Sequence, residues 1–151
     1  PLFLADHAAY LRTMREYADR FTQPWDANDT EATNKEFSQI RKYHALTSIL
    51  LPNMGRVREV YLRGIAQIRI TRTGLALLQY RNTHGDLPET LGPLPPESVR
   101  DPFSQRSLVY KPLGTGFDLY SVGPDQKDNG GAAREPRQKT DYDIVWHFRD
   151  R

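Results

Sequence analysis

The C-terminal third of this 151-residue chain restricts the fold most, because short strand-like runs there enclose a loop rich in glycine and acidic residues. Residues 107–111 and 116–122 have the composition of strands, and the PLGTG segment that joins them has the length and glycines of a hairpin turn. Residues 143–148 alternate well enough to form a third strand. We expect a small antiparallel sheet, which needs another element to cover its apolar face.

Helices are expected upstream of these strands. Apolar residues at helical spacing predict one helix over residues 4–21 and a second over residues 31–50, with a polar loop at residues 22–30. A third and longest helix is predicted over residues 57–78, and the Asn-Thr-His-Gly segment that follows is expected to end it.

Two apolar stripes are expected to face the core. On the first helix the inward positions are Leu4, Ala8, Leu11, Met14 or Arg15, Ala18 and Phe21. On the third helix they are Val57, Val60 or Tyr61, Gly64 or Ile65, Ile68, Thr71 or Arg72, Leu75 and Leu78. Because glycine costs about 1 kcal/mol relative to alanine inside a helix, Gly64 and Gly74 suggest close approach of a neighbouring element.

The segment after Gly85 has a different character. Its prolines rule out a continuing helix and favour an extended connector; they are Pro88, Pro93, Pro95, Pro96 and Pro102. The predicted fold class is therefore α+β, with N-terminal helices, including one long helix, packed on a small C-terminal antiparallel sheet. We expect two regions, a helical N-terminal extension over residues 1–55 and a second domain over residues 56–151.

Composition excludes several classes of protein. The absence of cysteine excludes disulfides, thiol catalysis and zinc thiolate sites. No run approaches the roughly 18 apolar residues of a membrane span, so we expect none. The chain opens on Pro1 with no basic leader, which suggests a fragment of a longer protein. The net charge is only +2, and the arginines of the third helix suit a solvated face, so we expect no nucleic-acid partner.

Acidic residues in the C-terminal loop are candidate metal ligands. Asp125 and Asp128 lie on one side of a charged insert, and Asp141 and Asp143 lie on the other. The spacing is not that of an EF-hand, because Lys127 and Pro136 would fall where a ligand oxygen is required. Two alternatives remain open: a calcium site built from a longer loop, and an Asx-rich turn whose oxygens accept backbone N–H groups.

Catalytic signatures are weak. The four histidines show no metal-ligating spacing, and we expect His84 to cap a helix end and His147 to face solvent. Ser121 lacks the G-x-S-x-G frame of a nucleophile elbow. Glu89 and Asp101 are carboxylates that nothing in the sequence places across a cleft. We therefore expect a non-enzymatic protein.

Motifs over about residues 65–148 carry a resemblance to a known family. LALLQYRNTHGDLPETL, DPFSQRSLVY, GFDLYSVGPDQKDNGG and DIVW follow one another in the order found in the major pseudopilin of type II secretion systems. The positions that match the family's motifs are Tyr80, Gly85 and Pro88, then Asp101, Pro102 and Phe103, then residues 118–123 with Asp125, and finally Asp143, Ile144 and Trp146. The chain resembles especially the pseudopilin-like C-terminal modules of large envelope proteins from planctomycete-type bacteria.

The resemblance implies a calcium-binding loop. Asp125 and either Asp143 or Asp141 would bind Ca²⁺, with backbone carbonyls from the region of Leu119 and Val122. Asp128 is a plausible additional ligand.

The resemblance also implies a role. It implies an extracytoplasmic, calcium-stabilised structural or interaction domain of a bacterial envelope or secretion-related protein, with other protein domains or envelope proteins as partners. The alternative is an accessory C-terminal domain of a larger enzyme or regulatory polypeptide.

Overall fold

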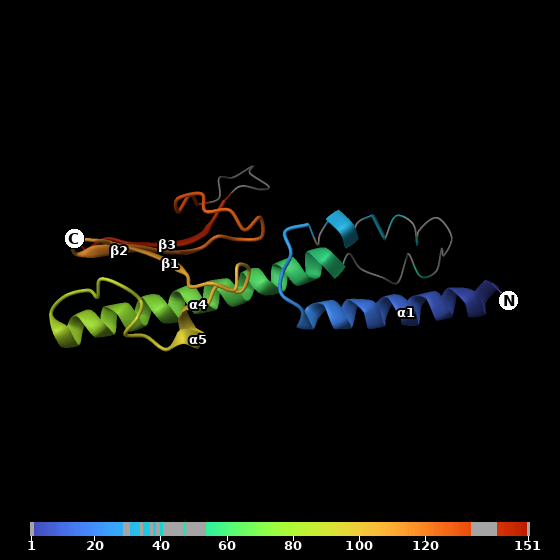
Figure 1. Ribbon diagram of the computed structural model, residues 1–151, viewed down its shortest axis with the longest axis horizontal. Helices are drawn as coiled ribbons and strands as arrows, with labels where there is room; N and C mark the ends of the chain where they lie inside the picture. Colours follow the sequence, from blue (N-terminus) through green and yellow to red (C-terminus); the bar gives the residue numbers. More distant parts are fainter. Residues whose placement is uncertain are drawn as a thin grey trace. The chain divides into compact units, whose positions relative to one another are not determined.

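The computed structural model shows helices followed by a three-stranded antiparallel sheet, so the predicted α+β class with a long helix is confirmed (Figure 1). The structure describes residues 2–28, 31–33, 35, 36, 38, 40, 47, 54–133 and 142–150. The chain divides into two units, Pro1–Tyr61 and Leu62–Arg151, which are described separately below. Among the described residues, no helix is both long and apolar enough to cross a membrane.

The first unit contains α1, which spans Leu2–Thr22 and confirms the first predicted helix. The predicted inward stripe is wrong, since Leu4 is 70% exposed and Leu11 is 52% exposed. The buried positions are instead Thr13 and Tyr17, on the helix face that also carries Asp6. The Thr47 hydroxyl donates to the Asp6 backbone carbonyl at 2.8 Å. The buried face of α1 therefore differs from the one that apolar periodicity predicts.

The predicted helix over residues 31–50 lies largely outside the described residues, and those described, among them Thr33 and Thr47, are helical. The loop after α1 is confirmed at residues 23–28. Within this unit Trp25 is buried, and the Arg58 guanidinium lies 5.4 Å from its ring centroid. The same guanidinium donates to the Pro24 carbonyl at 3.0 Å, so Arg58 is buried at 5% exposure, whereas a solvated face was predicted for it.

The long helix α4 spans Met54–His84 and ends where the sequence predicts. Gly85 has a φ of +91° and donates its N–H to the Arg81 carbonyl at 2.8 Å, which is the glycine-terminated helix end expected from its position. The predicted inward stripe is wrong here too. Ile68 is 56% exposed and Leu75 is 57% exposed, and Val57, Val60 and Tyr61 are exposed as well.

The buried positions of α4 in the second unit are Ala66, Ile70, Thr73, Gly74 and Leu77. A side-chain carbon added at Gly74 would collide with the Trp146 ring, so the close approach predicted at this glycine is confirmed. Among the described residues nothing lies within 4 Å of the corresponding position at Gly64, so the prediction is wrong there. The Trp146 ring therefore packs on α4 at a position where only a residue without a side chain fits.

The connector after α4 is mainly irregular, as predicted, but it contains the one-turn helix α5 at Pro96–Val99. Side-chain hydrogen bonds hold the connector to the helix before it and to the strand after it. Thr73 of α4 donates to the Ser98 carbonyl at 2.9 Å, and the Tyr110 hydroxyl donates to the Pro88 carbonyl at 2.9 Å. Phe103, near its end, is fully buried. The connector thus contributes to the core of the second unit.

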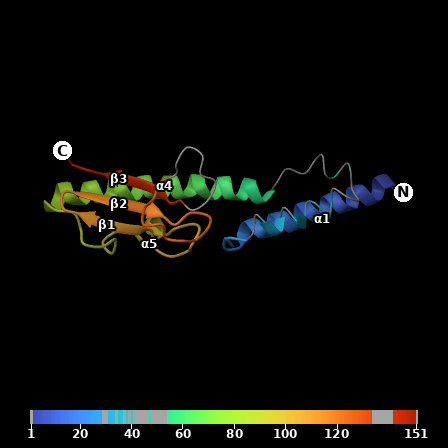
Figure 2. The same ribbon diagram turned by 90° about the horizontal axis from the view of Figure 1, so that it is seen from above.

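The sheet contains β1 at Val109–Leu113, β2 at Gly116–Ser121 and β3 at Ile144–Phe148, in the spatial order β1-β2-β3. All three predicted strands are confirmed, with β1 starting two residues later than expected. Figures 1 and 2 show the sheet lying along one side of α4, with β2 between the other two strands. The face toward α4 is aromatic, and the Phe117 ring centroid lies 5.9 Å from that of Trp146 and 5.3 Å from that of Phe148.

Candidate metal centre in the acidic loop

The loop that follows β2 is anchored by a carboxylate from the connector. Asp101 is 1% exposed, and its Oδ1 accepts the Phe103 N–H at 2.9 Å and the Ser121 hydroxyl at 2.8 Å. Its Oδ2 accepts the Val122 N–H at 3.1 Å. One buried side chain therefore connects the connector to the last residue of β2 and to the first residue of the loop.

The loop then turns sharply and meets the segment that leads into β3. Gly123 has a φ of +72°, and Gln126 donates its N–H to the Gly123 carbonyl at 3.2 Å. A side-chain carbon at Gly123 would lie 2.9 Å from the Tyr142 carbonyl oxygen, so only glycine fits this close approach. Two segments that lie far apart in the sequence are thereby brought side by side.

Asp143 is the acidic residue at the centre of this arrangement. Its side chain is 2% exposed, and its Oδ2 accepts the Gly131 N–H at 2.8 Å. Burial raises the pKa of Asp143, and the negative charges of Asp128 and Asp125 raise it further, while the Gly131 and Asn129 N–H groups oppose the shift. The structure therefore holds a carboxyl whose ionised form is disfavoured by burial first and by two neighbouring carboxylates in addition.

Asp128 lies in a more favourable environment. Its Oδ1 accepts the Gly130 N–H at 2.8 Å and the Tyr120 hydroxyl at 2.9 Å. The Gly130 hydrogen bond is the main reason why the pKa of Asp128 is lowered, and the Tyr120 hydrogen bond lowers it further. Lys111 lies 5.0 Å from the Tyr120 ring centroid and donates to the Gly130 carbonyl at 3.2 Å, which fixes this side of the loop to β1.

Asp125 is held only weakly by its neighbours. Its Oδ1 accepts the Lys127 N–H at 3.3 Å, and its Oδ2 accepts the Asn129 side-chain amide at 3.4 Å. Both distances are longer than the usual range for such hydrogen bonds. The Asp125 carboxylate therefore retains most of its capacity to bind another group.

The predicted ligands fall into three groups. Asp125, Asp128 and Asp143 lie in or beside one loop, close enough for their charges to interact. Leu119 lies in the central strand opposite Tyr110 and Trp146, and Val122 follows that strand. Asp141 lies outside the described residues.

The chemistry of these donors fits calcium in kind, because carboxylate and carbonyl oxygens are its preferred ligands. The number of side-chain ligands brought together is smaller than a metal site needs. Within the described part of the chain, no three Asp, Glu, His or Cys side chains are grouped so that they could hold a metal ion. Several loop carboxylate oxygens also accept backbone N–H groups, as the Asx-turn alternative requires.

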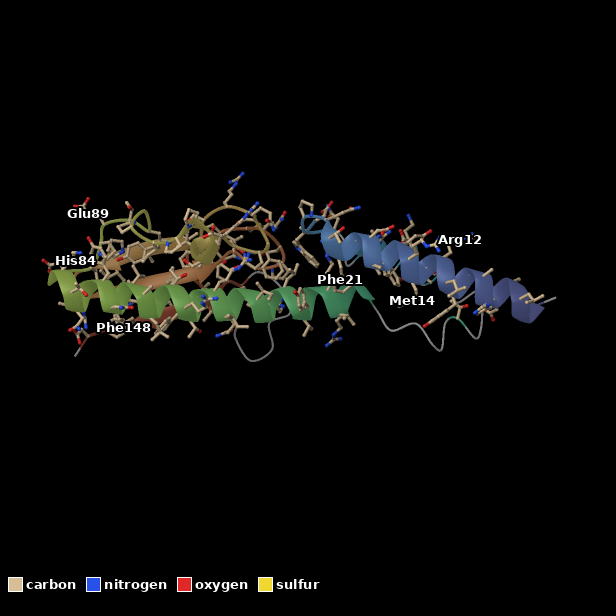
Figure 3. The ribbon with its side chains drawn as sticks, turned by 90° about the horizontal axis from the view of Figure 1, so that it is seen from below. Arg12, Met14, Phe21, His84, Glu89 and Phe148 are labelled. Atoms are coloured by element: carbon tan, nitrogen blue, oxygen red, sulfur yellow. The ribbon has the colours of Figure 1, made fainter. Side chains whose placement is uncertain are left out.

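Asp101 was not predicted as part of this site. The sequence signal was its place in the Asp-Pro-Phe segment, where an aspartate side chain commonly accepts the N–H group two residues later. Its contact with Ser121 is made across 20 sequence positions, which no local pattern reports. Glu89, the other carboxylate considered for catalysis, is exposed and lies by the C-terminal end of α4, near His84 (Figure 3).

The two described histidines of the second unit lie in positions close to those predicted. His84 lies in the last turn of α4 with its Nδ1 2.9 Å from the Tyr80 carbonyl oxygen, and its ring stacks on the Tyr80 ring with centroids 3.9 Å apart. His147 is exposed on β3, and its Nδ1 lies 2.7 Å from Asp118 Oδ1. Arg149 lies 2.7 Å from the same oxygen, so Asp118 contacts both the His147 imidazole and the Arg149 guanidinium.

Comparison with known proteins identified no relative of this chain. No protein-family model, no curated protein and no solved structure matches this chain.

Proposed function

We propose that the second unit is a non-catalytic structural or interaction domain whose C-terminal loop is ordered by calcium. In this proposal the domain is pseudopilin-like and belongs to an extracytoplasmic bacterial envelope or secretion-related protein, where it contacts other protein domains. The motif resemblance and the arrangement of the acidic loop support the proposal. Catalysis forms no part of it.

The observation that carries the proposal is the environment of Asp143. Burial and the charges of Asp128 and Asp125 raise the pKa of Asp143, so its ionised form destabilises the loop in the absence of a cation. A divalent cation between Asp143 and Asp125 would remove this penalty. Asp125 suits the role because its own hydrogen bonds are long.

The remaining ligands would come from several sources. The proposal assigns Asp128, the backbone carbonyls of Leu119 and Val122, and Asp141 as further oxygen donors, since calcium takes six to eight. When bound, the ion would supply positive charge that links the loop after β2 to the segment before β3. The chain's own contribution is to hold the carboxylates together, which Asp101 and Gly123 achieve through the contacts described above.

The test compares thermal unfolding of the wild-type chain and of Asp143→Asn, each with calcium and with chelator. In chelator the variant should be at least as stable as the wild type, because asparagine removes a disfavoured buried charge and keeps an acceptor for the Gly131 N–H. With calcium at 100 times its dissociation constant, the wild type should gain about 2.7 kcal/mol and the variant should gain little. Asp86→Asn is the matched control, since Asp86 is exposed in the same unit.

The pH dependence of the stability provides a second test with the same two chains. Because the pKa of Asp143 is raised in the folded chain, the folded state binds more protons than the unfolded state between the ordinary and the raised value. In chelator, wild-type stability should therefore fall as pH rises through this window, and Asp143→Asn should lack that part of the dependence. Equal calcium responses in the wild type and Asp143→Asn would contradict the proposal, and an equal response to magnesium would remove the preference for calcium.

A further inference from the structure

The acidic loop contains the one asparagine of the chain that directly precedes a glycine, since Gly130 follows Asn129. In such a pair the backbone nitrogen of the glycine can attack the carbonyl carbon of the asparagine side chain, because glycine has no side chain to block the approach. The attack forms a five-membered succinimide ring. A residue with a side chain follows each of the other asparagines, which are Asn28, Asn34, Asn53 and Asn82.

The surroundings of Asn129 leave its side chain free to move. Its amide nitrogen donates to Asp125 Oδ2 at 3.4 Å and to the Lys127 carbonyl at 3.5 Å, and both distances are longer than the usual range for such hydrogen bonds. Gly130 is exposed, and among the described residues beyond its two chain neighbours nothing lies within 4 Å of the position of an added side-chain carbon. The Asn129 amide can therefore turn toward the Gly130 nitrogen.

One hydrogen bond opposes the attack. The Gly130 N–H donates to Asp128 Oδ1 at 2.8 Å, and the nitrogen must lose this hydrogen before it can attack. The negative charge of Asp128 also disfavours the anion that the nitrogen becomes. Because Asp128 is itself exposed, the hydrogen bond breaks whenever the loop opens locally.

We propose that Asn129 is a site of spontaneous deamidation, and that the hydrogen bond between Gly130 and Asp128 limits its rate. Hydroxide from the solvent takes the Gly130 proton, and the nitrogen forms a bond with Asn129 Cγ. The bond from Cγ to Nδ2 then breaks, and Nδ2 takes a proton from water and leaves as ammonia, which regenerates the hydroxide. Water opens the ring at Cγ to give aspartate, or at the backbone carbonyl to give isoaspartate.

Both products change the acidic loop. Aspartate places a further carboxylate beside Asp125, in place of the amide that donates to it. Isoaspartate lengthens the backbone by one carbon, which displaces the N–H groups of Gly130 and Gly131 from the carboxylates of Asp128 and Asp143. The loop is therefore altered irreversibly as the protein ages, whether or not it binds calcium.

The test follows the mass of the peptide of residues 128–134, which trypsin releases from the full chain after incubation at neutral pH in chelator. Deamidation raises this mass by about 1 Da. The wild type should show the gain, and Asn129→Gln should not, because glutamine would have to form a less favourable six-membered ring. The peptide of residues 82–100 is an internal control, since Asn82 lies within α4 and should keep its mass.

The role of the hydrogen bond is tested with Asp128→Ala. Because a hydrogen bond to a charged group is lost, deamidation of Asn129 should be faster than in the wild type by about tenfold. Asp86→Ala, at an exposed carboxylate outside the loop, should leave the rate unchanged.

Two results would overturn the proposal. The first is a wild-type chain that keeps its mass during a period in which the isolated peptide of residues 125–133 deamidates completely, since Asn129 would then not be a site of the reaction. The second is a folded Asp128→Ala variant that deamidates no faster than the wild type, since the hydrogen bond would then not limit the rate. Incubation in chelator makes both results independent of calcium binding.

Discussion

Asp101 determines where the acidic loop begins, and its effect can be measured with one substitution. Asp101→Ala removes the acceptor for the Phe103 and Val122 N–H groups and for the Ser121 hydroxyl, all of which are buried. Since each buried donor left without an acceptor costs about 1–3 kcal/mol, we expect a loss of at least about 3 kcal/mol in the free energy of unfolding. Urea denaturation measures it.

The control for this prediction is Asp86→Ala, which alters an exposed carboxylate and should change the stability by less than about 0.5 kcal/mol. A loss of similar size in both variants would show that the Asp101 contacts do not support the loop.

The acidic residues show how much of the candidate site could be predicted from the sequence. Composition alone was enough to select Asp125, Asp128 and Asp143, because an acidic cluster beside glycines is a local signal. The difference between them was not predictable. Burial raises the pKa of Asp143, while the Gly130 N–H group lowers the pKa of Asp128, and both burial and this hydrogen bond are set by the folded loop.

At the scale of elements, two glycines of α4 form a matched pair for mutation. Gly74→Ala should destabilise the second unit by about 1–3 kcal/mol, because the added carbon collides with the Trp146 ring. Gly64→Ala should stabilise it by up to about 1 kcal/mol, because the position is open and alanine favours the helix. Thermal or urea unfolding of both variants measures the difference. Effects of the same sign would contradict the proposed packing of the sheet on Gly74.

The same helix shows which parts of an element can be predicted from sequence. The end of α4 was predictable, because Gly85 at a positive φ is a local signal, and the strands were predictable from composition and the turn at residues 114–115. The buried face was not. Ile68 and Leu75 have the expected periodicity but are exposed, whereas Ala66, Ile70 and Gly74 are buried, and the Trp146 ring packs against Gly74. Alanine and glycine contribute little to an apolar pattern, so the sequence did not reveal this face.

At the scale of the whole chain, the two tryptophans report on different units. Trp25 belongs to the first unit and Trp146 to the second, and the chain contains no others. Trp25→Phe and Trp146→Phe therefore yield two chains, each with fluorescence from one unit. If calcium binds the acidic loop, it should shift the unfolding transition seen by Trp146 and leave that seen by Trp25 unchanged.

A common shift of both fluorescence transitions would contradict the expectation that calcium affects only the transition seen by Trp146. A shift seen by Trp25 alone would show that calcium does not bind at the acidic loop. Denaturant titrations with and without calcium distinguish these outcomes from the expected one.

The position of β2 between its two partners affects how the protein is assembled during translation. β2 is synthesised before β3, so a growing chain halted short of residue 144 can pair its most buried strand along one side only. Arg81 likewise emerges 69 positions ahead of Asp150, the carboxylate that it contacts at 2.8 Å. Because unpaired strand edges favour aggregation, we expect the nascent polypeptide to be most prone to aggregate before β3 has left the ribosome.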